Sequence, residues 1–375
     1  MMQMRLLLFF LILASLSTPF ACAQDSVELG KLAESVRHAR YEGGPDHART
    51  ITELNQLAQQ IGALIDKGTL TPQEKAAAYY YRGTARVQIV NLDYFDGKKV
   101  NEPLGWQALS DLDKVIADGI EDRELGASIS DTLYAAGSVS AILNSYPRAY
   151  SYWEKCAALD HAGCMNIMAE ARLTGAGNQK IDLHAAIDYH LKVFNTGTSY
   201  HCAGAYSAQR IAAIGYFTGT ATPQGDELYW IRKAADLVGQ LTNGDKKVEG
   251  CELSGILIDE FLYRLARGER EDALLDDASG KPTLDANATN AVVGLLSGRL
   301  TPNGFSSAMQ LVKTDLGKCT GHFRALWYAE LIKRTNLAQN YYQHINGCSA
   351  ELLFARKFKI SPAIKKQVIV PGAHR

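Results

Sequence analysis

The sequence lacks the short motifs that mark several classes of enzyme. It has no Gly-x-Ser-x-Gly turn, and no serine is followed three residues later by lysine, so these two forms of serine catalysis are not indicated. No two cysteines form a Cys-x-x-Cys pair, which leaves a zinc ribbon or a thioredoxin-type motif without support. Gly175-Ala-Gly177 follows a helical pattern rather than a strand, so it predicts a helix end and not a phosphate-binding loop. No cofactor is predicted.

The sequence also lacks an excess of either charge sign and a long apolar run outside its N-terminus. Lys plus Arg number 39 and Asp plus Glu number 40, a net charge of −1. A nucleic-acid-binding surface needs a clear basic excess, so we expect no nucleic-acid partner. Beyond residue 23 no apolar run reaches the roughly 20 residues of a membrane-spanning helix, so stable membrane insertion is not expected.

The N-terminus has the pattern of a cleavable signal peptide, residues 1–23. Arg5 provides the positive charge, Leu6–Leu13 is an unbroken apolar run, and Ala21-Cys22-Ala23 fits the cleavage rule. A lipoprotein anchor on Cys22 is the less favoured alternative, because Pro19 stands where an aliphatic residue is usual. We therefore predict a periplasmic or secreted protein.

A repeat in the middle of the chain predicts the fold. Trp153, Tyr189 and Trp230 lie 36 and 41 residues apart, each in a helical stretch that continues into Lys or Arg, and Gly175 and Gly219 punctuate the stretches between them. A period of about 35–45 residues with one helical hairpin per period is typical of a repeat array. The sequence therefore predicts an all-α fold, an α-solenoid of antiparallel helix hairpins.

The changes in pattern along the chain predict five segments. They are the signal peptide (1–23), an N-terminal helical part (24–145), the repeats (146–268), a junction (269–301) that contains a short apolar helix, and a C-terminal helical part (302–375) with a long helix near 323–342 and a loose tail.

Two stretches resemble known helical repeats. Tyr81, Gly83 and Ala85 resemble the first helix of a tetratricopeptide repeat, in which the glycine allows close backbone approach, and residues 149–239 resemble Sel-one-like repeats. Gly83 and the matching Ala108 are 25 residues apart, about twice the family's spacing. We interpret the excess, Asp93 to Gly105, as a surface loop, with a binding loop as the alternative.

Six cysteines remain after removal of the signal peptide: Cys156, Cys164, Cys202, Cys251, Cys319 and Cys348. An even number in an exported chain suggests three disulfides among fifteen connectivities. The Trp-x-x-Cys-Ala-x-Leu context and spacing of Cys156 and Cys164 resemble the exported helicobacter cysteine-rich proteins, although those carry the pair in nearly every repeat. The resemblance implies a Cys156–Cys164 bridge, worth about 2.5 kcal/mol.

The other four cysteines are assigned less directly. Cys202 and Cys251 each precede a helix-ending glycine, Gly219 or Gly268, by 17 residues. They therefore begin equivalent helices of adjacent repeats, where a bridge is possible if their Cα atoms approach within about 7 Å. Cys319 and Cys348 remain, on either side of the long C-terminal helix. We interpret all six as structural rather than catalytic.

Candidate binding residues are mostly aromatic. Tyr79, Tyr80 and Tyr81 occupy one helical turn and cannot all point inward, because successive residues differ by about 100°. We take Tyr79, Tyr80 and the nearby Trp106 as candidates for a concave binding surface, although ordinary helix packing also explains such residues. Tyr263 and Arg264 form a polar stretch that suits a groove, although a solvated helix face is the more frequent outcome.

Metal ligands are not indicated. His184 and His190 are six residues apart on one predicted helix, and Asp111 and Asp113 are two apart on another. Neither pair shares a helix face, so no metal site is predicted.

The sequence thus predicts a non-enzymatic, exported scaffold that presents a groove to a protein or peptide, a role that rests on the repeat class. Two alternatives remain open. One is a cell-envelope enzyme or accessory factor that acts on peptidoglycan or a β-lactam, with a cell-wall glycan as partner. The other is a secreted effector that binds host proteins.

Overall fold

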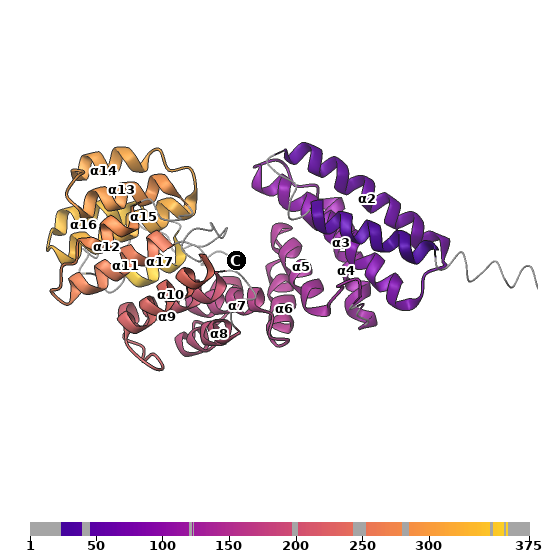
Figure 1. Cartoon of the computed structure of the whole chain (residues 1–375), viewed down its shortest axis with the longest axis horizontal. Coiled ribbons are helices and arrows are strands. Elements are labelled where there is room, and N and C mark those ends of the chain that lie inside the picture. Colours follow the sequence, from indigo (N-terminus) through magenta and orange to yellow (C-terminus); the bar gives the residue numbers. More distant parts are fainter. Residues whose placement is uncertain are drawn as a thin grey trace, which may run out of the picture. The chain divides into compact units, whose positions relative to one another are not determined.

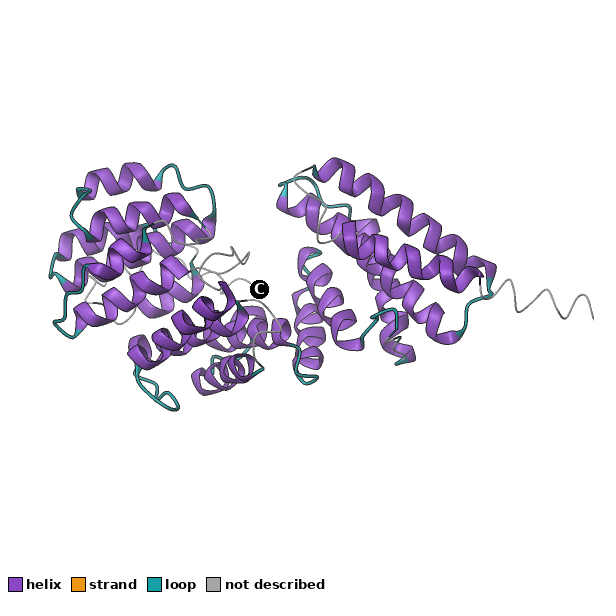
Figure 2. Cartoon of the chain, in the orientation of Figure 1, coloured by secondary structure: helices purple, strands orange, loops and turns teal. Residues whose placement is uncertain are grey.

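The chain folds into helices that pack in consecutive pairs (Figure 1). The computed structural model describes residues 24–39, 46–119, 122, 124–196, 202–242, 253–279, 285–345, 348–355 and 358, and these residues contain no strand (Figure 2). The predicted all-α fold of helix pairs is confirmed. The predicted signal peptide, the C-terminal tail and Cys251 lie outside the described residues.

Two compact units make up the chain, Met1–Cys164 and Met165–Arg375. The first unit contains a helix at 24–39, α2 (His47–Lys67), α3 (Pro72–Phe95), α4 (Glu102–Asp118), α5 (Ile129–Ile142) and α6 (Tyr146–Ala157). Helix α7 (Ala162–Thr174) contains the boundary. The second unit continues with a 3₁₀ turn at Ala176–Asn178, α8 (Leu183–Asn195), α9 (Ala203–Thr218), α10 (Glu227–Thr242), α11 (Leu253–Ala266), α12 (Ala273–Ala278), α13 (Ala286–Leu296), α14 (Pro302–Met309), α15 (Asp315–Leu331), α16 (Thr335–Gln343) and α17 (Ser349–Ala355). The predicted borders at 145, 268 and 301 stay predictions.

Local sequence signals set where helices begin and end. Helix α2 ends at Gly68, which has a left-handed φ of 73°. Thr71 then starts α3 with a capping box: its hydroxyl accepts a hydrogen bond from the Glu74 amide at 3.3 Å, and the Glu74 carboxylate accepts one from the Thr71 amide at 2.8 Å. Gly175, with φ of 79°, follows the last residue of α7, so the predicted helix end is confirmed.

The tetratricopeptide-like pair α3–α4 packs as the resemblance implies. A methyl group on Gly83 would lie 2.9 Å from the Leu112 side chain, so glycine permits the close approach of the two helices. The interpretation of Asp93–Gly105 as a surface loop holds only for residues 96–101, because α3 continues to Phe95 and α4 begins at Glu102. The other extra residues lengthen the two helices.

Helices α5 and α6 meet where Gly137 faces the Trp153 indole. A methyl group on Gly137 would lie well inside van der Waals contact of that ring. We expect Gly137→Ala to lower the free energy of unfolding of the first unit by about 1–3 kcal/mol through overpacking. Gly30→Ala is the matched control, since its methyl would meet only Leu125 at 3.8 Å. It should raise stability by about 0.5–1 kcal/mol. Urea unfolding followed by circular dichroism measures both, and the same sign for the two would contradict the packing described.

The C-terminal part differs from the prediction in two ways. The prediction of a single long helix near 323–342 is wrong. Helix α15 ends at Leu331, Lys333 has a positive φ of 58°, and α16 starts at Thr335. The apolar helix of the expected junction begins at Ala286, where Asp285 caps it by accepting a hydrogen bond from the Ala288 amide at 3.1 Å. That helix, α13, packs against α14 and α15, so it belongs to the core of the second unit.

Candidate functional site

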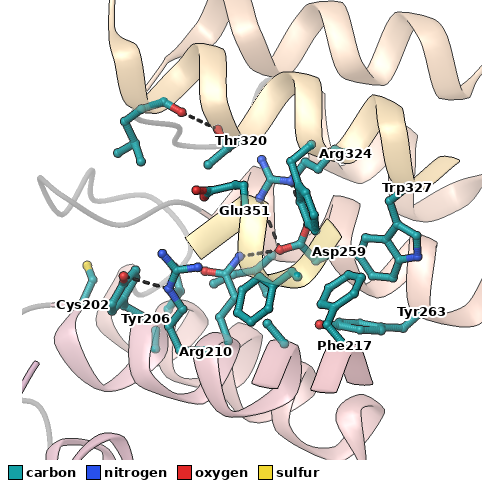
Figure 3. A pocket seen from close by; sticks show the side chains of 18 residues that line it. Cys202, Tyr206, Arg210, Phe217, Asp259, Tyr263, Thr320, Arg324, Trp327 and Glu351 are labelled. Atoms are coloured by element: carbon teal, nitrogen blue, oxygen red, sulfur yellow. Dashed lines mark hydrogen bonds and ion pairs between the residues drawn. The ribbon is translucent and has the colours of Figure 1, made fainter. Parts of the chain in front are cut away.

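The second unit contains a cavity of about 120 Å³ between α9, α11, α15 and α17 (Figure 3). Six aromatic side chains contribute to its lining: Tyr206, Phe217, Tyr263, Phe323, Trp327 and Phe354. We call it the aromatic cavity. Its volume suits one apolar side chain or a few water molecules rather than a whole cofactor.

Five of the aromatic rings, from Phe217 to Phe354, form one contiguous cluster. The Phe217 ring lies 4.9 Å from Trp327, 5.2 Å from Phe323 and 5.2 Å from Phe354, measured between centroids. Tyr263 meets Trp327 edge-on at 4.8 Å. Phe323 and Trp327 are four residues apart, so they project from the same face of α15. This places rings from α9, α11, α15 and α17 around a single space.

An ion pair ties α11 to α15 on one wall of the cavity. The Asp259 carboxylate accepts hydrogen bonds from Arg324 Nε at 2.7 Å and Nη2 at 3.3 Å, and from Gln209 Nε2 at 2.5 Å. Arg324 is buried. Burial and the nearby Asp259 charge raise the pKa of Tyr263 well above its ordinary value. A two-pronged pair of this kind fixes the spacing of the helices that carry it.

A second charged group joins α7 and α9. The Glu170 carboxylate lies 3.0 Å from Arg210 Nε and accepts a hydrogen bond from the Tyr206 hydroxyl at 2.8 Å. Burial acts to lower the pKa of Arg210, but Glu170 and Tyr206 hold it well above its ordinary value, with Glu351 adding to them. Arg210 is therefore a permanent cation at the cavity, facing carboxylates from α7 and α17.

A Ser–His–Glu arrangement occurs beside this group. His190 Nδ1 lies 3.3 Å from the Ser207 hydroxyl, and His190 Nε2 lies 3.7 Å from Glu170. However, Ser207 and His190 are both 0% exposed, and Ser207 donates its hydrogen bond to Asn166 at 2.9 Å. A nucleophile needs access to substrate, so the arrangement is one of packing. Its three residues lie on three different helices, so no sequence motif predicts the arrangement.

Two buried histidines make the second unit sensitive to acid. Burial, with Arg210, lowers the pKa of His190 to about 4 against the opposing effect of Glu170, and burial, with His344, lowers the pKa of His322 to about 4. Both are neutral in the folded state, while the unfolded chain takes up protons near pH 6.5. The unfolded state thus binds more protons between pH 4 and 6.5, so stability is lost as the pH falls through that range.

We expect the free energy of unfolding to decrease by roughly 1 kcal/mol per pH unit for each histidine below pH 6.5. Denaturant titrations at pH 7, 5.5 and 4.5 measure this slope. His322→Phe should remove its own share of the slope, and His344→Gln, at an exposed site, should leave most of it. A slope unchanged by His322→Phe would contradict the assignment.

The predicted polar stretch at Tyr263 and Arg264 divides between two environments. Tyr263 is 2% exposed and lines the aromatic cavity. Arg264 lies elsewhere, 2.9 Å from Glu260 and 2.9 Å from Glu271. The alternative of a solvated helix face is wrong, because Glu260 is also buried. Asp259, one turn before Tyr263 in the same polar stretch, is a charged residue of the cavity.

The aromatic candidates of the first unit also differ from one another. Tyr80 is buried and packs edge-on against Tyr81 at 5.0 Å. The prediction that Tyr80 contributes to a binding surface is therefore wrong. Tyr79 is half-buried beneath Lys114, whose nitrogen lies 4.4 Å from the ring centre. Trp106 is 44% exposed and lines a shallow depression together with Lys114. A binding role for Tyr79 and Trp106 stays a prediction.

The structure contains the predicted Cys156–Cys164 and Cys319–Cys348 disulfides. Cys202 at the start of α9 is also disulfide-bonded, and because its predicted partner Cys251 lies outside the described residues, that pairing stays a prediction. Two groups of metal-ligand type occur in the described part of the chain, one with His161 and one with Glu351, and each contains one of these disulfides. Metal binding by cysteine requires a free thiolate.

Comparisons with known proteins give one similar structure. No protein family and no curated protein matches the chain. The apo form of the quorum sensor NprR from B. thuringiensis is similar over 89% of this chain and 85% of its own, with 14% identity and a TM-score of 0.45. A likeness at this level carries no argument about function. None of the described helices has both the length and the apolar character needed to cross a membrane.

Proposed function

We propose that this protein is an exported, non-enzymatic helical-repeat scaffold that binds a peptide segment of a partner protein at the aromatic cavity. The observation that carries the proposal is the cavity itself, which combines aromatic rings from four helices with the fixed guanidinium groups of Arg210 and Arg324. Apolar concave sites with a few convergent polar groups are the usual form of a binding site.

The dimensions and charges of the cavity favour a peptide anchor over a small cofactor. About 120 Å³ accommodates a single apolar side chain. Both guanidinium groups already face carboxylates, Arg210 with Glu170 and Arg324 with Asp259, so the site as a whole does not demand a strongly charged ligand. Binding energy in such sites comes mainly from one or two buried anchor residues.

The state of the described cysteines and of Ser207 supports a non-enzymatic role. All five described cysteines are disulfide-bonded, and Ser207, which has a histidine beside it, is fully buried. The disulfides support export, since such bonds persist in oxidising compartments. Within the helical-repeat class, residues 149–239 favour Sel-one-like repeats.

Filling the cavity tests the proposed site. Ala213 lines it, and we expect Ala213→Leu to occupy part of its volume while leaving helix content unchanged. A displayed library of random peptides selected on the native protein should yield sequences with an aromatic anchor, and Ala213→Leu should weaken their binding at least tenfold. Ala273→Leu, at an exposed position of α12, is the matched control and should bind as the native protein does. Selected peptides that bind both variants equally would contradict the proposed site.

A further inference from the structure

The C-terminal segment formed by α17 and Phe358 packs against α9 and α15 of the second unit. Phe354 stacks on Phe217 at 5.2 Å, and Phe358 contacts Phe217 at 5.8 Å and Phe323 at 6.2 Å. Arg210 lies over the Phe354 ring at 6.0 Å. One segment thus contacts both α9 and α15, with its own side chains forming a wall of the aromatic cavity (Figure 3).

The contacts follow the pattern of a helix bound in a groove. Glu351, Phe354 and Ala355 of α17 are buried and stand at positions i, i+3 and i+4, and Phe358, beyond the end of the helix, is buried as well. This is the spacing by which an amphipathic helix places its apolar face into a receptor groove. Glu351 adds a charge at one end, where it acts on Arg210. The side chains of the segment therefore indicate that the groove accepts an acidic residue followed by aromatic residues.

A covalent anchor holds only the beginning of this segment. The Cys319–Cys348 disulfide joins α15 to the residue directly before α17. From Ser349 onward the described contacts with α9 and α15 are made by side chains. A tether of this kind would keep the segment at a high effective concentration near α9 and α15 if its side-chain contacts were broken.

The segment does not fill the groove completely. The aromatic cavity remains between it and the facing helices, with Ala205, Ala213 and Ile256 also on its lining. Side chains around an unfilled space lack partners on one side and forgo dispersion contacts. A helix that carried a larger aromatic residue at the position of Phe354, which lines the cavity, would make contacts that the internal segment does not make.

We propose that α17 and Phe358 are a tethered internal occupant of a helix-binding groove formed by α9 and α15, and that an amphipathic helix of a partner protein displaces them. The partner helix carries an acidic residue followed three positions later by phenylalanine or a larger aromatic residue, with a second aromatic residue after the helix. This inference rests on the proposed function and names its partner class.

A labelled peptide tests displacement directly on the full chain. The probe has the sequence of residues 348–358 with serine in place of Cys348. We expect it to bind the Phe354→Ala/Phe358→Ala variant at least tenfold more tightly than the native chain, because the variant weakens the internal competitor and leaves Arg210 and the groove walls intact. A control probe with alanine at both phenylalanine positions should bind neither protein. Leu311→Ala, at an exposed site outside the groove, should behave as the native chain does.

A second variant covers the case in which the double alanine variant loses its helical circular dichroism signal. Cys319→Ser/Cys348→Ser removes the disulfide that holds the start of the segment against α15 and should also bind the probe more tightly than the native chain. Equal affinity for native and variant chains, or no binding to a folded variant, overturns the inference. Exchange of the segment between two copies, seen as a dimer that the probe dissociates, overturns it as well. If library peptides whose binding is weakened by Ala213→Leu still bind the native chain when one of these outcomes is observed, the proposed function stands without the displacement of α17.

Discussion

Replacing Asp111 with asparagine is expected to lower the free energy of unfolding of the first unit by about 3–5 kcal/mol. The Asp111 side chain is 3% exposed and accepts hydrogen bonds from Arg82 Nε at 2.8 Å, Arg82 Nη2 at 2.7 Å and Arg86 Nη1 at 2.6 Å. The ion group joins α3 to α4. Without the Asp111 carboxylate, the two mostly buried guanidinium groups lie side by side with no shared counter-charge. Their mutual repulsion then adds to the cost of burying them away from water.

Asp113→Asn is the matched control two residues away. Asp113 and its partner Arg148 are 38% and 41% exposed, and exposed ion pairs contribute about 0–1 kcal/mol. We expect urea unfolding, followed by circular dichroism, to separate the two variants by at least 2 kcal/mol. Similar effects from both substitutions would show that Asp111 is not the buried centre of an ion group.

Removing the Cys319–Cys348 disulfide is expected to destabilise its unit by about 3.5 kcal/mol, against about 2.5 kcal/mol for Cys156–Cys164. The difference follows from the loops that the bonds close, with sequence separations of 29 and 8 residues, because the longer loop loses more entropy in the unfolded chain. Paired cysteine-to-serine variants, unfolded in urea without reductant, measure both values.

A non-reducing peptide map is the control for this comparison. It should recover both bridges from the native protein, and its third linked pair should contain Cys202. Free thiols at Cys319 or Cys348 would contradict the arrangement of α15 and α17. A larger loss for the shorter loop would contradict the entropic explanation.

The helical-repeat fold could be predicted because its signals are local. The spacing of Trp153, Tyr189 and Trp230 places these residues on α6, α8 and α10, and Gly219 ends α9 where a glycine stop was expected. Side-chain periodicity and helix-ending residues act within a few turns, so they are legible without tertiary structure.

The aromatic cavity could not be predicted because its members are far apart in sequence. Phe217, Asp259, Phe323 and Phe354 lie on four different helices, and no spacing rule connects them. The break at Lys333 was also hidden, since a positive φ at lysine has no sequence signal of the kind that glycine gives. Tyr80 shows the same limit, because a run of three tyrosines does not reveal which of them pack inward. The structure buries Tyr80 and Tyr81 and leaves Tyr79 half-buried.

The most direct test of the account is the location of a bound peptide. Hydrogen exchange of the native protein, measured with and without a peptide selected from the library, reports which helices gain protection. Our account predicts protection confined to α9, α11 and α15, increased exchange in α17, and neither change in Ala213→Leu. Protection elsewhere in the chain, or the same protection in Ala213→Leu, would contradict the assignment of the aromatic cavity as the binding site.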